Sequence, residues 1–349
     1  MLLNELLKQI SPVNRVAYED CQHRFDQVAK PIGSLGELET LLARIAAIFG
    51  SADIDITKKC VLVFCADNGV ADEGVAQSGS EVTTAIASMM TRQKSSICVM
   101  AKACNAETFV YDVGMRDTVP GLIPHKFMHG TGNIAIGPAM PREIAIKALE
   151  LGIDLVGEMK DQGFRLIATG EAGIGNTTTT SAMASVLLEK PVVEVTGRGA
   201  GLSDAGLAHK RMVIEQAIAY NSPNSADVLD VLSKIGGLDI ATMTGVFLGG
   251  AVHGLPVLMD GVISAVAALC ATQLNPLTRE YIIPSHLSAE PAASLLCQEL
   301  GFSPIIQADL RLGEGTGAVA LFPLLDMTAA VYHQAATFAD IAVEDYKRQ

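Results

Sequence analysis

A glycine-rich segment at residues 170–181, Gly-Glu-Ala-Gly-Ile-Gly-Asn-Thr-Thr-Thr-Thr-Ser, has the residue types best suited to binding a phosphate. The apolar run at 164–168 before it predicts a buried strand, and residues 182–188 after it predict a helix. A glycine turn between strand and helix exposes backbone N–H groups at the positive end of the helix dipole. The hydroxyl groups add further donors. The segment therefore predicts a phosphate site, in which Glu171 needs a separate role.

Two common nucleotide-binding motifs do not fit this segment. Residues 170–177 match the spacing of a nucleoside-triphosphate loop, but Asn176 stands where a lysine would reach the β- and γ-phosphates. Gly173 and Gly175 begin a dinucleotide fingerprint, but Thr178 replaces its third glycine. A monophosphate site fits better than either motif. The alternative is an ordinary glycine-rich connection whose threonines cap the helix.

A second glycine-rich segment, residues 196–202, precedes Lys210 and offers the positive charge that a phosphate needs. The chain carries 25 basic and 38 acidic residues, a net charge of −13. Such an acidic surface argues against a nucleic-acid partner, because nucleic-acid binding depends on Lys and Arg contacts to phosphates. Arg198 and Lys210 are therefore candidates for a local anion site. The alternative is a surface loop with solvated cations.

The best candidate for a general base is Glu314, which lies between two glycines and just before a predicted helix. Burial raises the pKa of a carboxylate and makes it a stronger base. Asp67, Glu171 and Asp260 also follow or end predicted strands, and the carboxyl ends of parallel strands meet at one edge of a sheet. These acids and Glu314 are predicted to converge on one crevice. The alternative is that each acid caps its own helix.

Other chemistries lack the residues they require. The sequence contains no HExxH or comparable cluster, and His286 has no second ligand at metal-binding spacing. It also contains no Gly-x-Ser-x-Gly elbow, which argues against a serine hydrolase. We therefore expect no metal site and no resident cofactor.

The pattern of elements predicts an α/β fold, a Rossmann-like parallel sheet flanked by helices. Apolar runs predict strands at 61–65, 107–113, 164–169, 256–259, 281–283 and 305–307, with alanine-rich helices between them. Both chain ends predict helices, including 321–346, so we expect a small helical domain (1–50 plus 320–349) and a large α/β catalytic domain (51–319). We see no signal peptide or membrane-length apolar run, which predicts a cytoplasmic protein without a membrane partner.

Seven segments, in order along the chain, resemble the nicotinate-nucleotide–dimethylbenzimidazole phosphoribosyltransferase family. They are KPIGSLGELE (30–39), ADNGVADEGV (66–75), GEAGIGNTTTTSA (170–182), GRGAGLSDAGL (197–207), Asp260-Gly261, SHLSAEP (285–291) and RLGEGTGA (311–318). The resemblance spans nearly the whole chain. It implies that nicotinate mononucleotide donates its phosphoribosyl group to 5,6-dimethylbenzimidazole, giving α-ribazole 5′-phosphate for cobalamin biosynthesis and releasing nicotinate. It also implies a homodimer that needs no metal.

The same resemblance assigns roles to individual residues. Glu314 is the implied general base, and Glu171 is a second catalytic carboxylate near the ribose or the nicotinate. Lys210 and Ser288 are placed near the phosphate. The residues implied to line the nucleotide are Gly173, Asn176, Thr177, Thr178, Gly201, Lys210, Asp260, Gly261, Ser288 and Gly313. Those implied to line the acceptor-base pocket are Gln77, Ser78, Ser80 and Leu312.

The sequence departs from the family pattern mainly in the acceptor region. Asn68 replaces a frequent histidine, Gly79-Ser80 replaces a frequent Pro-Gln, and Ala172 replaces a methionine. Because residues 77–89 line the base pocket in the family, the sequence also allows acceptors other than dimethylbenzimidazole. One alternative is phenol or p-cresol as the acceptor, with the chain as one subunit of a heterodimer of homologous chains. Another is a non-catalytic homologous subunit, against which the presence of Glu314 counts.

Overall fold

A single parallel sheet of six strands forms the centre of the computed structural model, which describes residues 3–347. The strand order is β3-β2-β1-β4-β5-β6. After β1 the chain adds β2 and β3 on one side, and it then crosses to the other side of β1 and adds β4, β5 and β6 in turn. β1 and β4 are therefore neighbours at the point where the order reverses, as in Rossmann folds. The predicted fold class is confirmed. The strands are β1 (Lys59–Ala66), β2 (Ala106–Gly114), β3 (Ile123–Pro124), β4 (Leu166–Ala172), β5 (Val257–Met259) and β6 (Ile282–Pro284).

The sequence prediction was wrong at the two edges of the sheet. Residues 305–307, predicted as a strand, form only one isolated parallel bridge, between Ile306 and His286. Pro304 precedes this run and has no N–H to donate to a ladder, and the run is only partly buried. At the opposite edge the two-residue strand β3 was not predicted, because so short a pairing leaves no periodic pattern in the sequence.

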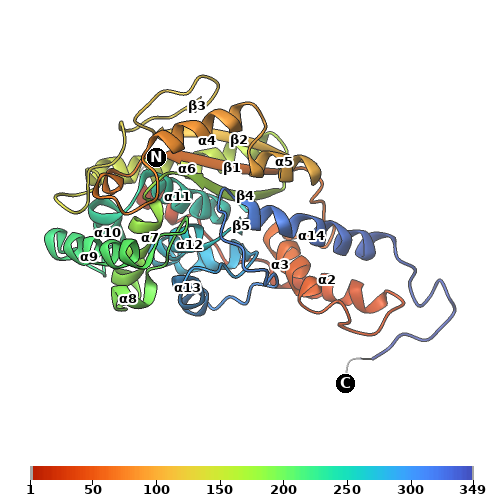
Figure 1. Cartoon of the computed structure of the whole chain (residues 1–349). Coiled ribbons are helices and arrows are strands. Elements are labelled where there is room, and N and C mark those ends of the chain that lie inside the picture. The colour runs from red at the N-terminus through yellow and green to blue at the C-terminus, as the bar shows by residue number, and fades with distance from the viewer. Residues whose placement is uncertain (1–2, 348–349) are drawn as a thin grey trace.

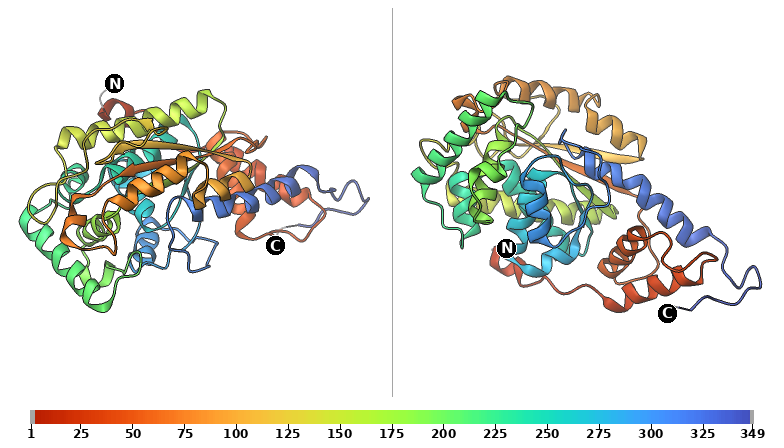
Figure 2. Two further views of the ribbon diagram at one scale, coloured as in Figure 1. Left: turned by 45° about the horizontal axis from the view of Figure 1, so that its top comes forward. Right: turned by 60° about the horizontal axis from the view of Figure 1, so that its bottom comes forward.

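Helices cover both faces of the sheet (Figures 1 and 2). On one face lie α4 (Glu81–Thr91), α5 (Ser96–Ala103) and α14 (Thr316–Gln334). On the other, α11 (Leu238–His253) packs against β1, β2 and β4 and is backed by α6 (Arg142–Asp161). Every residue of β1 is buried, as expected for a strand covered on both sides.

Helices α6 and α11 approach closely because glycines face the contact. A Cβ atom added to Gly245 would lie 2.0 Å from the backbone oxygen of Leu149. One added to Gly152 would lie 2.2 Å from the backbone oxygen of Thr242. All of α11 from Leu238 to Ala251 is buried, so this contact fixes the position of the helix beneath the sheet.

Beside the sheet, α2 (Arg15–Gln27) and α3 (Glu37–Phe49) from the first part of the chain pack with α14 from its last part (Figure 1). The rings of Phe25 and Tyr332 meet edge to face at 4.9 Å, and Val28 pairs with Thr337 in an antiparallel bridge. The predicted helix at 321–346 ends earlier, at Gln334, because the chain turns extended at Ala335 to make this bridge. The division into a helical and an α/β domain stays a prediction.

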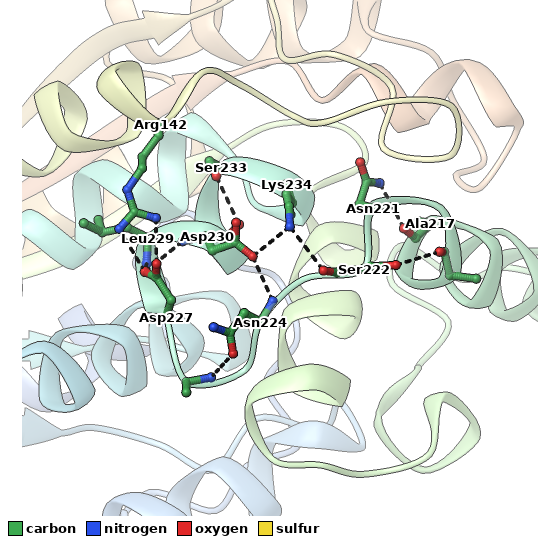
Figure 3. Close-up of polar contacts among 12 residues, drawn as sticks. Arg142, Ala217, Asn221, Ser222, Asn224, Asp227, Leu229, Asp230, Ser233 and Lys234 are labelled. Atoms are coloured by element: carbon green, nitrogen blue, oxygen red, sulfur yellow. Dashed lines mark hydrogen bonds and ion pairs between the residues drawn. The ribbon is translucent and has the colours of Figure 1, made fainter.

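A polar network fixes the turn between α9 (Asp204–Asn221) and α10 (Val228–Ile235) (Figure 3). Arg142, at the start of α6, pairs with Asp227 at 2.9 Å. Lys234 Nζ donates to Asp230 Oδ2 at 2.9 Å and to the backbone oxygen of Ser222 at 3.1 Å. The network holds α10 in place just before the chain enters α11.

The remaining helices are short or surround the crevice described below. They are α1 (Leu3–Leu7), η1 (Gly69–Glu73), α7 (Asn176–Leu187), α8 (Val192–Val195), α12 (Val262–Leu274), η2 (Pro276–Tyr281) and α13 (Ala292–Leu300). Among the helices of residues 3–347, none is both long and apolar enough to cross a membrane.

The close contact of α6 and α11 predicts that Gly245→Ala is destabilising. Its methyl group would overlap the backbone of α6, so the helices must separate, at a cost of about 1–3 kcal/mol in the free energy of unfolding. Urea unfolding measures this. Gly137→Ala is the matched control, because a Cβ atom there meets nothing within 4 Å and its φ is not in the left-handed region. Equal stability of the two variants would contradict the account.

Candidate active site

A cavity of about 210 Å³ lies at the carboxyl ends of β4, β5 and β6. Ligands bind at this edge of parallel α/β sheets, beside the point where the strand order reverses. Four segments supply most of its walls, namely the loop after β4, the turns after β5 and β6, and the loop before α14. The lining includes Glu171, Gly173, Asn176, Thr177, Asp260, Gly261, Ser288, Leu312, Gly313 and Glu314, all predicted from the sequence, together with Ile86, Gly199, His286 and Glu290, among others.

Glu314 sits in a left-handed backbone conformation, with φ at 61° between two glycines that are also left-handed. This conformation is costly for a residue with a side chain, and strained residues of this kind cluster at functional sites. Its Oε2 accepts a hydrogen bond from the backbone N–H of Ile97 at 3.3 Å, near the start of α5. Burial raises the pKa of Glu314 despite this bond, and the charge of Asp260 raises it further. The result is a carboxylate with increased basicity on the cavity wall.

Two buried carboxylates hold the Glu314 loop in place. Asp260, directly after β5, accepts from the backbone N–H groups of Gly315 at 3.2 Å and Ala318 at 2.9 Å, and so caps the start of α14. Glu171 Oε1 accepts from the backbone N–H of Glu314 at 3.3 Å. A Cβ atom on Gly170 would lie 2.3 Å from the backbone oxygen of Glu314, so only glycine allows this approach.

Glu171 and Asp239 share the side-chain amide of Asn176. Asn176 Nδ2 donates to Glu171 Oε2 and, at 3.2 Å, to Asp239 Oδ2. Burial, followed by the charges of Asp239 and Asp260, raises the pKa of Glu171 to about 8. Burial raises the pKa of Asp239 to about 6. Glu171 is therefore largely protonated at neutral pH and can donate a hydrogen bond as well as accept one.

His286 forms a wall of the cavity next to Asp260. Its Nδ1 lies 3.1 Å from Ser285 Oγ, which donates to the backbone oxygen of Met259 at 2.6 Å. Burial lowers the pKa of His286, although Asp260 at 4.0 Å acts in the opposite direction. A neutral imidazole therefore contacts the acid cluster. Within residues 3–347, no three His, Cys, Asp or Glu side chains gather as a group that could hold a metal ion.

Lys210 on α9 is fully buried behind the second glycine-rich loop. Its Nζ donates to Thr177 Oγ1 at 2.8 Å, and no carboxylate of the described residues pairs with it within 4.0 Å. Burial lowers the pKa of Lys210 to about 8, while the charge of Glu290 partly opposes this shift. A buried ammonium without an ion-pair partner is typical of a site built for an anion. Glu290 Oε1 is occupied by the backbone N–H of Gly199 at 3.1 Å.

Six predicted site residues lie outside the cavity lining, namely Gln77, Ser78, Ser80, Thr178, Gly201 and Lys210. Gln77 Nε2 donates to the backbone oxygen of Gly201, which links the loop before α4 to the second glycine-rich loop. Ser78 and Ser80 are half-buried in the same loop, and Ser80 precedes α4. Thr178 is fully buried within α7 and does not face the cavity. Leu312, by contrast, lines the cavity and is 56% exposed.

Of the four acids predicted to converge, three do so. Asp67 does not line the cavity, and its Oδ2 accepts from the backbone N–H of Arg116 at 2.7 Å. Its place in the acid cluster is taken by Asp239, which sequence reasoning missed. Asp239 lies at the start of a helix rather than after a strand, so strand-end reasoning did not reach it. The pair Gly236-Gly237, which precedes Leu238 and Asp239 at the start of the helix, was the available signal.

Comparisons with known proteins find similar sequences and a similar fold. The profile of a phosphoribosyltransferase family matches residues 10–343. The nicotinate-nucleotide–dimethylbenzimidazole phosphoribosyltransferase of Ruminiclostridium cellulolyticum is 43% identical, and that of Geobacter sulfurreducens is 44% identical; in each case the match covers 99% of both chains. The crystal structure of CobT from Thermus thermophilus has a TM-score of 0.89 at 36% identity and covers 95% of this chain and 100% of its own.

The raised pKa values of Glu171 and Asp239 predict that stability falls as pH rises. Both groups bind protons more tightly in the folded chain than in the unfolded chain. Their contribution to stability is complete below pH ~4, near their unfolded pKa values. It is lost as pH rises through about 6 for Asp239 and about 8 for Glu171. Glu171→Gln lacks this proton-binding group. We therefore expect the free energy of unfolding of the variant, relative to that of the wild type, to be higher at pH 8 than at pH 5 by more than ~1 kcal/mol.

Urea unfolding of the wild type and Glu171→Gln at pH 5 and pH 8 checks this expectation. The control is Glu143→Gln, which removes an exposed carboxylate at the start of α6. Identical pH dependence of all three proteins would show that Glu171 is not a buried, proton-binding group.

Proposed function

The chain belongs to the nicotinate-nucleotide–dimethylbenzimidazole phosphoribosyltransferase family, and on that premise we propose that it transfers the phosphoribosyl group of nicotinate mononucleotide to 5,6-dimethylbenzimidazole. It is a pentosyltransferase enzyme. The products of the proposed reaction are α-ribazole 5′-phosphate and nicotinate. The observation that carries the proposal is the polarity of the crevice. Thr177 on its wall accepts from the buried, unpaired ammonium of Lys210 behind it, and Glu314 on the wall is a carboxylate of raised pKa.

In the proposed binding mode, the phosphate of nicotinate mononucleotide lies at Lys210 and Thr177. The backbone of the two glycine-rich loops approaches it closely, and Ser288 adds a hydroxyl from the wall after β6. Charge-assisted hydrogen bonds to a buried ammonium are among the stronger polar contacts in proteins. The ribose then extends along the cavity toward Glu171, whose protonated carboxyl can donate to an oxygen of the substrate.

In the proposed chemical step, a ring nitrogen of the acceptor attacks the anomeric carbon of the ribose. The new C–N bond forms as the bond to nicotinate breaks, and the nicotinate ring leaves as a neutral pyridine. Glu314 takes the proton from the other ring nitrogen of the acceptor. Positive charge builds on the ribose in this transition state, and the carboxylates on the wall stabilise it. The raised pKa of Glu314 makes it a better proton acceptor.

The acceptor ring is proposed to bind at the apolar region of the cavity. Ile86 and Leu312 give the cavity an apolar region for a flat ring. The loop before α4, where the sequence departs from the family pattern, lies next to it and carries Ser78 and Ser80. p-Cresol is the second candidate acceptor, because a phenol also has a single proton for Glu314 to remove. We further propose that the enzyme works as a dimer of homologous chains, which sedimentation measures.

We expect Glu314→Gln to reduce the rate of transfer by about 100-fold or more, because the amide cannot accept the proton. The assay incubates the purified chain with nicotinate mononucleotide and either dimethylbenzimidazole or p-cresol, and identifies the product by mass. The isosteric change should leave nucleotide binding intact. Normal turnover by Glu314→Gln would refute its role as the base. A product from p-cresol alone would replace the proposed acceptor.

We expect Lys210→Met to weaken the binding of nicotinate mononucleotide by about 10- to 100-fold, through loss of a charged hydrogen bond. For the wild type, affinity should fall as pH rises above about 8, because Lys210 then loses its proton in the free enzyme. Calorimetric titrations across this pH range measure both effects. Lys190→Met, which removes an exposed lysine just after α7, is the matched control. Unchanged affinity in Lys210→Met would place the phosphate elsewhere.

A further inference from the structure

A larger cavity, of about 780 Å³, lies away from the candidate active site. Its walls come from α2, from α3, from η2 and from the turn after α13. Arg44 on this wall donates to the backbone oxygen of Ile282 at 2.6 Å, and Ile282 is the first residue of β6. The cavity is therefore at the amino end of β6, whereas the crevice with Glu314 is at the carboxyl ends of the strands. Two separate sites are thus available to ligands.

Two arginines dominate this cavity. The guanidinium carbons of Arg44 and Arg279 lie 5.6 and 5.8 Å from the ring centre of Phe302, which places both positive groups around one buried ring. Arg279 Nη2 donates to the backbone oxygen of Gly301 at 3.0 Å. In residues 3–347, neither arginine has a carboxylate within 4.0 Å. Most of the five N–H donors of each guanidinium therefore remain open.

The other charged groups of the cavity do not form ion pairs with these two arginines among the described residues. Arg15, at the start of α2, adds a third positive charge. Glu280 Oε2 is occupied by the backbone N–H of Val13 at 2.9 Å, and Glu19 forms no ion pair with the three arginines within the described part of the chain. Burial lowers the pKa of Arg44, and the charge of Arg279 lowers it further, while Tyr18 and Glu37 act in the opposite direction. The two cations thus repel one another across a half-buried space, and an anion between them would relieve that repulsion.

We propose that this cavity is a second ligand site, which binds a small organic anion through Arg44 and Arg279. A carboxylate or a phosphate monoester fits, because planar guanidinium groups bind both in a bidentate manner. The volume is in the range of small-molecule sites and far exceeds that of a bare ion. Pro12, Val13, Ala47 and Pro276 offer apolar surface to the body of such a ligand. This site is independent of the proposed function.

Calorimetric titration with nicotinate, nicotinamide and inorganic phosphate tests the second site. Nicotinate and nicotinamide share a ring and differ in charge, and phosphate has no ring. We expect the nicotinate isotherm of the wild type to contain a binding component from this cavity. In the double variant Arg44→Met/Arg279→Met, that component should be at least tenfold weaker or lost. Nicotinamide should lack this component. Competition by phosphate would assign the site to oxyanions in general, and absence of competition would assign it to ring carboxylates.

The matched control is Arg165→Met, because Arg165 also lies over an aromatic ring, the half-buried Phe49, at 4.2 Å but does not line the cavity. Arg279→Met alone is a second test variant, since Arg279 is exposed and its loss should leave the fold intact. An identical nicotinate isotherm in the wild type and the double variant would overturn the proposal. So would a change in subunit association without a change in anion binding. The second site does not depend on transferase activity. If the wild-type chain proves inactive as a transferase, loss of the nicotinate-binding component in the double variant would still support the site.

Discussion

The start of α14 is attached to the edge of the sheet by buried carboxylates, and the geometry of the crevice depends on this attachment. Asp260 accepts from two backbone N–H groups of the helix terminus, and Glu171 accepts from the N–H of Glu314. The absence of a side chain at Gly170 lets the two backbones meet. A carboxylate at a helix N-terminus is stabilised by the helix dipole, so the capping favours the buried charge of Asp260. In this arrangement Glu314 adopts a left-handed backbone conformation, which is strained for a residue with a side chain.

Placing so many acids together has an electrostatic consequence. Glu171 lies near Asp239 and Asp260 in a buried region, and burial together with their charges disfavours ionisation of Glu171. The amide of Asn176 links two of them, and protonation of Glu171 removes one charge at neutral pH. Behind Thr177 on the wall of the crevice, the buried ammonium of Lys210 has no ion partner among the described residues. The region of the crevice therefore combines a cation, which acts through Thr177, with a group of carboxylates.

The sequence predicted those parts of the fold and the site that depend on local patterns. Glycines beside Glu171 and Glu314, and the end of an apolar run before Asp260, indicated where backbone and ligand approach each other. Asp239 was missed because it begins a buried helix and reaches the cluster only through the packing of α11. The end of α14 was misplaced because a long-range bridge, from Val28 to Thr337, stops the helix. Arg44 and Arg279 are 235 positions apart, so no sequence pattern could bring them together.

The most direct test of the attachment is amide hydrogen exchange across residues 313–318 in the wild type and in Asp260→Ala, with Asp161→Ala as a surface control. The hydrogen bonds to Gly315 and Ala318 predict slow exchange in the wild type and in the control, and much faster exchange in Asp260→Ala, with β4 still protected. Equal protection of this segment in all three proteins would contradict the account, because the Glu314 loop would then be held by other contacts.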